Sequence, residues 1–167
     1  YQLAQKGISY DFQSFFVTVE NGDETLLNLF LAANMPVDIQ EHLYQNTALI
    51  TAAAHGHLNV VATILDKKPA VNTQNQNGQT ALISATTNGH YEVSRSLLSN
   101  GANVHVRDNK GWDALMFAAA QNQVEIVKEL LHYGADKNAK DTIGQTALSI
   151  AKNKSHFEIV ALLQNVH

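Results

Sequence analysis

The sequence predicts an all-α solenoid of stacked helix-turn-helix units with projecting, β-hairpin-like finger loops. Three features predict this fold. A short capping motif recurs every 33 residues, an apolar set with helical spacing follows each copy, and polar loops rich in Gly, Asn and Asp separate the copies. The copies of the motif are Thr47-Ala48-Leu49, Thr80-Ala81-Leu82, Asp113-Ala114-Leu115 and Thr146-Ala147-Leu148. A constant interval of this size indicates one supersecondary unit that buries its apolar face against neighbouring copies.

The repeat divides one continuous domain into successive units. We expect residues 1–10 to be the tail of an upstream helix or an N-terminal cap, because Leu3 to Gly7 resemble the end of a second helix. The units that follow are a degenerate repeat 1 at 11–44, repeat 2 at 45–77, repeat 3 at 78–110, repeat 4 at 111–143 and a C-terminal capping repeat at 144–167. The chain does not begin with Met, which is consistent with a segment upstream.

The first helix of each unit is expected to begin directly after the Thr or Asp of the motif. A hydroxyl or carboxylate at this position can accept a hydrogen bond from the free N–H groups of the first turn. Asp113 replaces Thr without loss of this cap. The run from Ala48 to Ala54 is rich in small side chains, which lets the first helices lie close together.

A tight turn and a second helix are expected next. Gly56 and Gly89 suit a left-handed residue between the two helices, and Gly101 and Gly134 suit the end of the second helix. In repeat 1 the turn falls at residues 21–23. The polar segment from Gly101 to Gly111 has Asn, Asp and Gly where a chain reverses, so it should project as a hairpin-like finger.

These residues resemble a known family. The unit Gly78-Gln79-Thr80-Ala81-Leu82, with Asn88-Gly89-His90 and Gly101-Ala102-Asn103, is similar to a complete ankyrin repeat, and residues 111–143 resemble one as closely. The sequence departs from the family around the first-helix Leu, where Ala precedes it and the family often has Pro. The resemblance implies that the turn histidines, His57, His90 and His156, hydrogen-bond nearby backbone.

Composition restricts the class of partner. The chain of 167 residues has 11 basic and 15 acidic residues, a formal charge of -4 and no Cys. A negative balance gives no electrostatic basis for binding nucleic acid, and no apolar run is long enough to cross a membrane. We expect another protein as partner, no cofactor, and a monomer rather than an oligomer. The compartment stays open, with a cytoplasmic location preferred and secreted or periplasmic locations as alternatives.

No pattern predicts catalysis. The sequence contains no nucleophile elbow, phosphate-binding loop or paired-carboxylate arrangement, so we name no catalytic residue and expect no enzyme. His55 and His57 flank Gly56, but two imidazoles without further ligands do not define a metal site. Glu92, Glu125 and Glu158 begin the second helices, where carboxylates favour the helix dipole, and Glu125 can pair with Lys128.

Trp112 admits two interpretations. It occupies a finger position where the other units have Asn46, Gln79 and Gln145, so the fold itself does not require an aromatic side chain there. An exposed indole would suit a partner contact, because rigid aromatic side chains supply much of the energy at protein interfaces. The alternative is that Trp112 packs over Met116 or against the adjacent finger.

The resemblance to ankyrin repeats implies a binding surface formed by finger tips and the exposed side of the first helices. Its positions in this chain are Tyr44, Asn46, His55, Gln76, Asn77, Gln79, Thr87, Asn88, Arg107, Asn109, Lys110, Trp112, Gln121, Lys140, Thr142, Ile143 and Gln145. The set is rich in amides and mildly basic, which favours an acidic or amide-rich protein segment as ligand.

The leading functional hypothesis is a non-catalytic protein-interaction module, with regulation or inhibition of the partner as one form of it. One alternative is that the repeats are the interaction domain of a larger enzyme or effector whose catalytic part lies outside this chain. The other is a structural, self-associating repeat protein.

Overall fold

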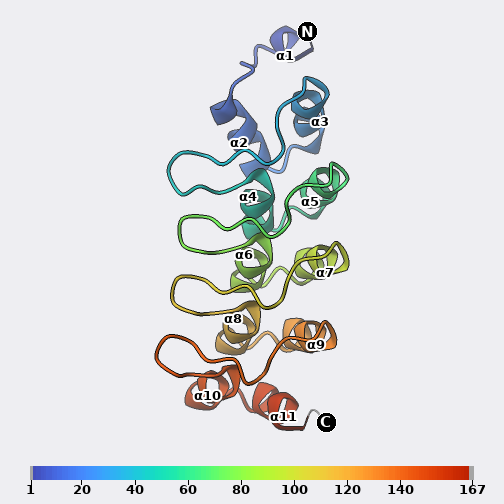
Figure 1. Ribbon diagram of the computed structural model, residues 1–167. Helices are drawn as coiled ribbons and strands as arrows, with labels where there is room; N and C mark the ends of the chain where they lie inside the picture. Colours follow the sequence, from blue (N-terminus) through green and yellow to red (C-terminus); the bar gives the residue numbers. More distant parts are fainter. Residues whose placement is uncertain (1, 166–167) are drawn as a thin grey trace.

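The computed structural model describes residues 2–165 and consists of paired helices joined by long loops (Figure 1). A first layer is formed by the helices that open each pair: α2 (Phe12–Glu20), α4 (Ala48–His55), α6 (Ala81–Thr87), α8 (Ala114–Ala120) and α10 (Ala147–Asn153). A second layer is formed by α3 (Glu24–Ala32), α5 (Leu58–Leu65), α7 (Tyr91–Ser99), α9 (Val124–His132) and α11 (Phe157–Asn165). The loops between pairs all project to the side of the first layer (Figure 1).

The prediction of an all-α solenoid is confirmed. No strand occurs within residues 2–165, and each expected unit after residue 10 contains one helix pair. The short helix α1 (Gln2–Gln5) packs against α3, on the side where a preceding second helix would lie. The solenoid is therefore built from contacts between neighbouring pairs.

The four predicted caps are confirmed at α4, α6, α8 and α10. The side chains of Thr47, Thr80, Asp113 and Thr146 accept hydrogen bonds from the backbone N–H three residues further along. Small side chains then form the interior of the first layer, since Ala48, Ala52, Ala53, Ala85 and Ala118 are fully buried. Alanine at these positions lets successive first helices approach closely.

The turn within each pair has a left-handed residue, as predicted for Gly56 and Gly89. The equivalent Asn122 and Ser155 also have positive φ, of 58° and 60°. At Gly56 the need for glycine is also steric, because a Cβ would lie 2.5 Å from Nδ1 of His90. The turn of one unit is thus shaped by the unit that follows it.

The turn histidines join neighbouring units, in agreement with the structural role that we expected. A ring nitrogen of His57 lies 2.7 Å from the carbonyl oxygen of Glu20, that of His90 lies 3.0 Å from Ala54, and that of His156 lies 2.8 Å from Ala119. Each imidazole hydrogen-bonds a carbonyl at the end of the previous first helix, where such groups lack intrahelical partners.

The core of repeat 3 is more polar than that of its neighbours. Thr86 and Ser94 are buried between α6 and α7, and their hydroxyl groups have no hydrogen-bond partner. Repeat 4 has Ala119 and Val127 at the equivalent positions, both fully buried. A buried hydroxyl without a partner costs free energy, so this repeat is packed less favourably than the next.

Candidate protein-binding surface

Each finger is a tight loop closed by one polar side chain at its start. The Oδ1 atom of Asp108 accepts hydrogen bonds from the backbone N–H groups of Lys110 and Trp112, both at 2.9 Å. Asn75 and Asp141 accept from the equivalent N–H groups of their fingers, and Glu41 does so in the first. One hairpin-like backbone bond, from Asp108 N–H to the Trp112 carbonyl, completes the loop.

Successive fingers are joined by backbone hydrogen bonds. The N–H of Asn109 donates to the carbonyl of Asn77 at 3.0 Å. The N–H groups of Gln76 and Thr142 donate in the same way to the carbonyls of Tyr44 and Lys110. The fingers between residues 41 and 145 therefore form one connected array.

A side-chain ladder adds to this array. Nε2 of Gln40 donates to the carbonyl of Gln74, Nε2 of Gln74 to that of Arg107, and Nη1 of Arg107 to that of Lys140, at 3.2, 3.0 and 3.1 Å. The sequence placed Arg107 on the partner-binding surface as one of its positive charges. Its guanidinium is exposed but is also engaged in holding the next finger.

Trp112 is half-buried, and its indole is used by the fold. Nε1 donates to Oδ2 of Asp141 in the next finger at 3.0 Å, and the ring meets Phe117 edge to face at 5.0 Å. Of the two interpretations, packing against the adjacent finger is the one that these contacts confirm, and contact of the half-buried ring with a partner stays a prediction. Although burial raises the pKa of Asp141, the N–H groups of Gln145 and Ile143 and the indole together lower it.

Asn46, the residue equivalent to Trp112 in repeat 2, also bonds the next finger through its side chain. In the first finger Oδ1 of Asn46 accepts a hydrogen bond from Nδ2 of Asn75 at 2.8 Å. Gln79, at the same position between these two, makes no such bond to Asp108. The side chain at this position therefore bonds the next finger at Asn46 and at Trp112 but not at Gln79. The second and third fingers are joined instead by the side chains of Gln74 and Asn109.

Two adjoining hollows lie on the finger side of the first helices, and Asn77 and Gln79 line both. The first, of about 190 Å³, is lined by Tyr44, Asn46, Ile50, Ala54, Asn75, Asn77, Gln79, Ser84, Thr87 and Asn88. The second, of about 350 Å³, is lined by Asn77, Gln79, Asp108, Asn109, Lys110, Trp112 and Phe117. Together they form a shallow groove, which we call the amide groove.

The amide groove collects about half of the residues that the sequence predicted for the binding surface. Those that line it are Tyr44, Asn46, Asn77, Gln79, Thr87, Asn88, Asn109, Lys110 and Trp112. Those that line neither hollow are His55, Gln76, Arg107, Gln121, Lys140, Thr142, Ile143 and Gln145. Of these eight, all but the half-buried Gln145 are exposed, and Ile143 is 77% exposed.

The sequence prediction missed Phe117 and Ser84, which occupy the same position of α8 and α6. The missed signal is an aromatic residue at a position where repeats 2 and 3 have Thr51 and Ser84 and the last repeat has Ile150. Because the side chain at this position changes in size and polarity along the chain, the surface that it helps to form differs from repeat to repeat.

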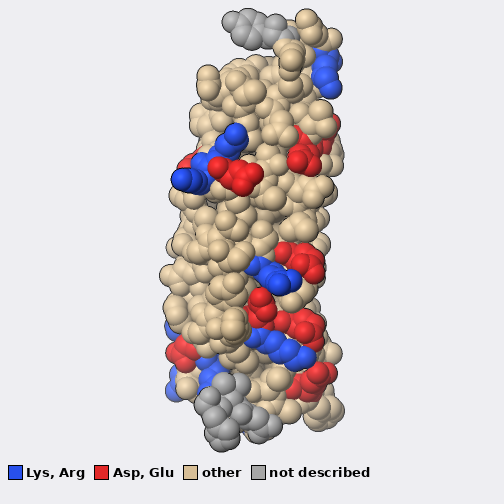
Figure 2. All heavy atoms as spheres, turned by 90° about the vertical axis from the view of Figure 1, so that its right-hand side faces the viewer, with Lys and Arg blue, Asp and Glu red and all other residues tan. Residues whose placement is uncertain are grey.

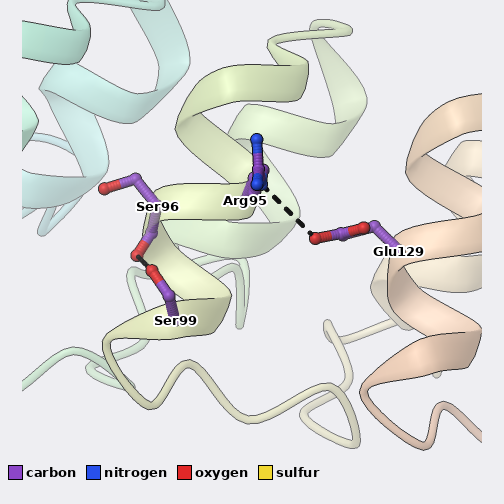
Figure 3. A network of polar contacts seen from close by, with 4 residues as sticks. All are labelled: Arg95, Ser96, Ser99 and Glu129. Atoms are coloured by element: carbon purple, nitrogen blue, oxygen red, sulfur yellow. Dashed lines mark hydrogen bonds and ion pairs between the residues drawn. The ribbon is translucent and has the colours of Figure 1, made fainter.

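The outer surface of the second layer carries charges that pair with one another (Figure 2). Nζ of Lys128 lies 2.7 Å from Glu125, as predicted, and Nε of Arg95 lies 3.8 Å from Oε1 of Glu129 across the gap between α7 and α9 (Figure 3). Exposed pairs of this kind contribute little to stability.

The histidine pair gives no metal site of the usual kind. The rings of His55 and His57 stack at 5.8 Å, but their bonded nitrogens face the carbonyls of Thr51 and Glu20. Within residues 2–165 no three His, Asp or Glu side chains are grouped as metal ligands. In the same part of the chain, no helix has the length and hydropathy that crossing a bilayer requires.

The geometry defines a repeat protein of paired helices, with a connected array of fingers along one side. A family model for ankyrin repeats, described as three copies, matches the chain at residues 15–108, 71–141 and 100–167. The chain therefore belongs to the ankyrin repeat family, whose members are generally protein-interaction modules and typically non-catalytic. No curated protein matches the sequence.

Proposed function

We propose that this chain is a non-catalytic module that binds one partner protein on the surface formed by its finger tips and first helices. The observation that supports this most strongly is the connection of the fingers to one another by backbone and side-chain hydrogen bonds. A surface held in place before binding loses little conformational entropy when it docks. Regulation or inhibition of the partner would follow from covering part of its surface.

The exposed residues of this surface suit contact with a protein. Tyr44 is 54% exposed at the tip of the first finger and supplies an aromatic anchor. Arg107, Lys110 and Lys140 are exposed on the fingers, whereas Asp108 and Asp141 are partly or fully buried and accept hydrogen bonds from their own fingers. This distribution of charge favours a partner segment that is neutral or acidic rather than basic.

Site-specific photo-crosslinking tests the proposal. A photoreactive amino acid is placed at Tyr44 or Lys110 on the finger side, and at Asn59 or Glu125 on the outer layer as matched exposed controls. We expect one protein from the native source to be crosslinked at both finger positions and at neither control. Crosslinking of the same protein from the outer positions alone would overturn the proposed face.

A further inference from the structure

We propose that the amide groove binds an extended peptide segment at Gln79, whose side chain does not bond the next finger as those of Asn46 and Trp112 do, with one large apolar side chain against Trp112 and Phe117. This proposal deepens the proposed function and rests on it. The expected partner segment has free main-chain N–H and C=O groups next to an aromatic or large aliphatic residue. Gln79 is the position that would hydrogen-bond its main chain.

Several polar side-chain groups that line the groove have no hydrogen-bond partner in the described part of the chain. Within residues 2–165 the side-chain amides of Asn77 and Gln79 and the ammonium of Lys110 make no hydrogen bond, and Oδ2 of Asp108 has no partner. All four residues line the larger hollow of the amide groove. A carboxamide presents a donor and an acceptor side by side, which matches the N–H and C=O of a peptide unit.

Gln79 differs in its hydrogen bonding from Asn46 and Trp112, the equivalent residues of the neighbouring fingers. Asn46 and Trp112 use this position to bond the next finger, at 2.8 and 3.0 Å, so Oδ1 of Asn46 and the indole N–H of Trp112 are occupied. Gln79 leaves its own amide and Oδ2 of Asp108 free at the middle of the groove. Covering these groups with an apolar surface would cost their desolvation, so the occupant must supply hydrogen bonds here.

One side of the larger hollow is apolar and is formed by two aromatic side chains. Trp112 and Phe117 lie edge to face along the same hollow, and the indole N–H is already bonded to Asp141. The aromatic surface therefore offers packing without a free donor. A volume of about 350 Å³ lies at the low end for small-molecule sites, which suits one side chain of a segment that crosses the groove.

The test selects short random linear peptides displayed on phage against the intact chain, and then measures the affinity of the enriched peptide for variants. Gln79→Trp introduces tryptophan at position 79, which is the residue that bonds Asp141 at the equivalent position 112 of the next repeat. We expect this variant to fill the groove and weaken peptide binding about tenfold or more. Gln79→Ala, which only removes the amide, should weaken binding in the same direction.

The matched control is Asn59→Trp, which introduces the same side chain at an exposed position of α5 on the outer layer, away from both hollows. Its affinity should equal that of the unmodified chain, and the enriched sequences should share one aromatic or large aliphatic residue. Equal binding to Gln79→Trp and the unmodified chain would overturn this proposal, and so would enrichment of no sequence. If Gln79→Trp binds the peptide as the unmodified chain does but Tyr44→Ala binds it more weakly, this proposal fails and the proposed function stands. If neither variant binds the peptide more weakly, both fail.

Discussion

At the scale of single residues, the caps and turns follow from local chemistry, whereas the role of Trp112 depends on a residue in another repeat. A Thr or Asp before a helix finds its hydrogen-bond partner three residues along the chain, so its function can be predicted from spacing alone. Trp112 bonds Asp141 in the next finger, and that pairing depends on how closely two units stack. The sequence therefore predicted the cap at Asp113 but left two interpretations for Trp112.

Asp113 gives the first testable prediction at this scale. It is buried where the other units have Thr, and although Met116 N–H donates to it, burial raises its pKa above the ordinary value of 3.8. The folded state then binds this proton more readily than the unfolded state, so stability falls as pH rises from 3.8 through the raised pKa. Asp113→Thr should keep the cap and raise the free energy of unfolding at pH 7 by about 1 kcal/mol.

Urea denaturation at pH 7 and in mild acid measures this effect. The gain from Asp113→Thr should shrink at the acidic pH, because a larger share of the Asp113 carboxyl is neutral there than at pH 7. Asp113→Asn is the matched control, since it removes the charge and keeps the shape. A loss of stability in both variants at pH 7 would show that the buried carboxylate is favourable.

Trp112 gives a second prediction. Trp112→Ala removes the hydrogen bond to Asp141 and the contact with Phe117, so we expect a loss of about 2 kcal/mol in thermal or urea unfolding. Trp112→Phe keeps an aromatic ring and loses only the indole N–H, and should cost about 1 kcal/mol. An unchanged melting temperature for Trp112→Ala would restore the interpretation of Trp112 as a free anchor for a partner.

At the scale of helices and fingers, periodicity predicts what each unit contains but not how strongly each is packed. The helix pairs and the position of the fingers follow from the recurring motif and apolar positions. The links between fingers do not, because Gln74 and Arg107 look like ordinary surface residues until their partners in the next finger are placed beside them. For the same reason, about half of the predicted binding residues lie outside the amide groove.

The second helix of repeat 3 gives a prediction at this scale. Ser94 is 1% exposed with an unpaired hydroxyl, at the position occupied by Val61 and Val127 in the adjacent repeats. Ser94→Val replaces an unsatisfied polar group by apolar packing and should raise the free energy of unfolding by about 1 kcal/mol. Ser94→Ala, measured in the same urea series, separates removal of the hydroxyl from the added methyl groups. Destabilisation by both variants would contradict an unpaired hydroxyl.

At the scale of the whole molecule, the connected fingers make one long surface from units that otherwise contact only their neighbours. Each finger is tied to the one before it by a backbone bond between Tyr44 and Gln76, Asn77 and Asn109, or Lys110 and Thr142. Bonds of this kind along a solenoid oppose independent motion of single loops. The stiffness of the binding surface is therefore a property of the array and not of any one finger.

Amide hydrogen exchange tests this stiffness. The N–H groups of Gln76, Asn109 and Thr142 lie in exposed loops, but each donates to the preceding finger. They should exchange about tenfold more slowly, or slower still, than the N–H groups of Gln74, Arg107 and Lys140, which have no acceptor within residues 2–165 and serve as controls in the same fingers. Exchange depends on opening of the bond to the previous finger, so equal rates in the two sets would mean that the fingers move independently. The groove would then have to be ordered by its partner, and the entropic argument for tight binding to a rigid surface would fail.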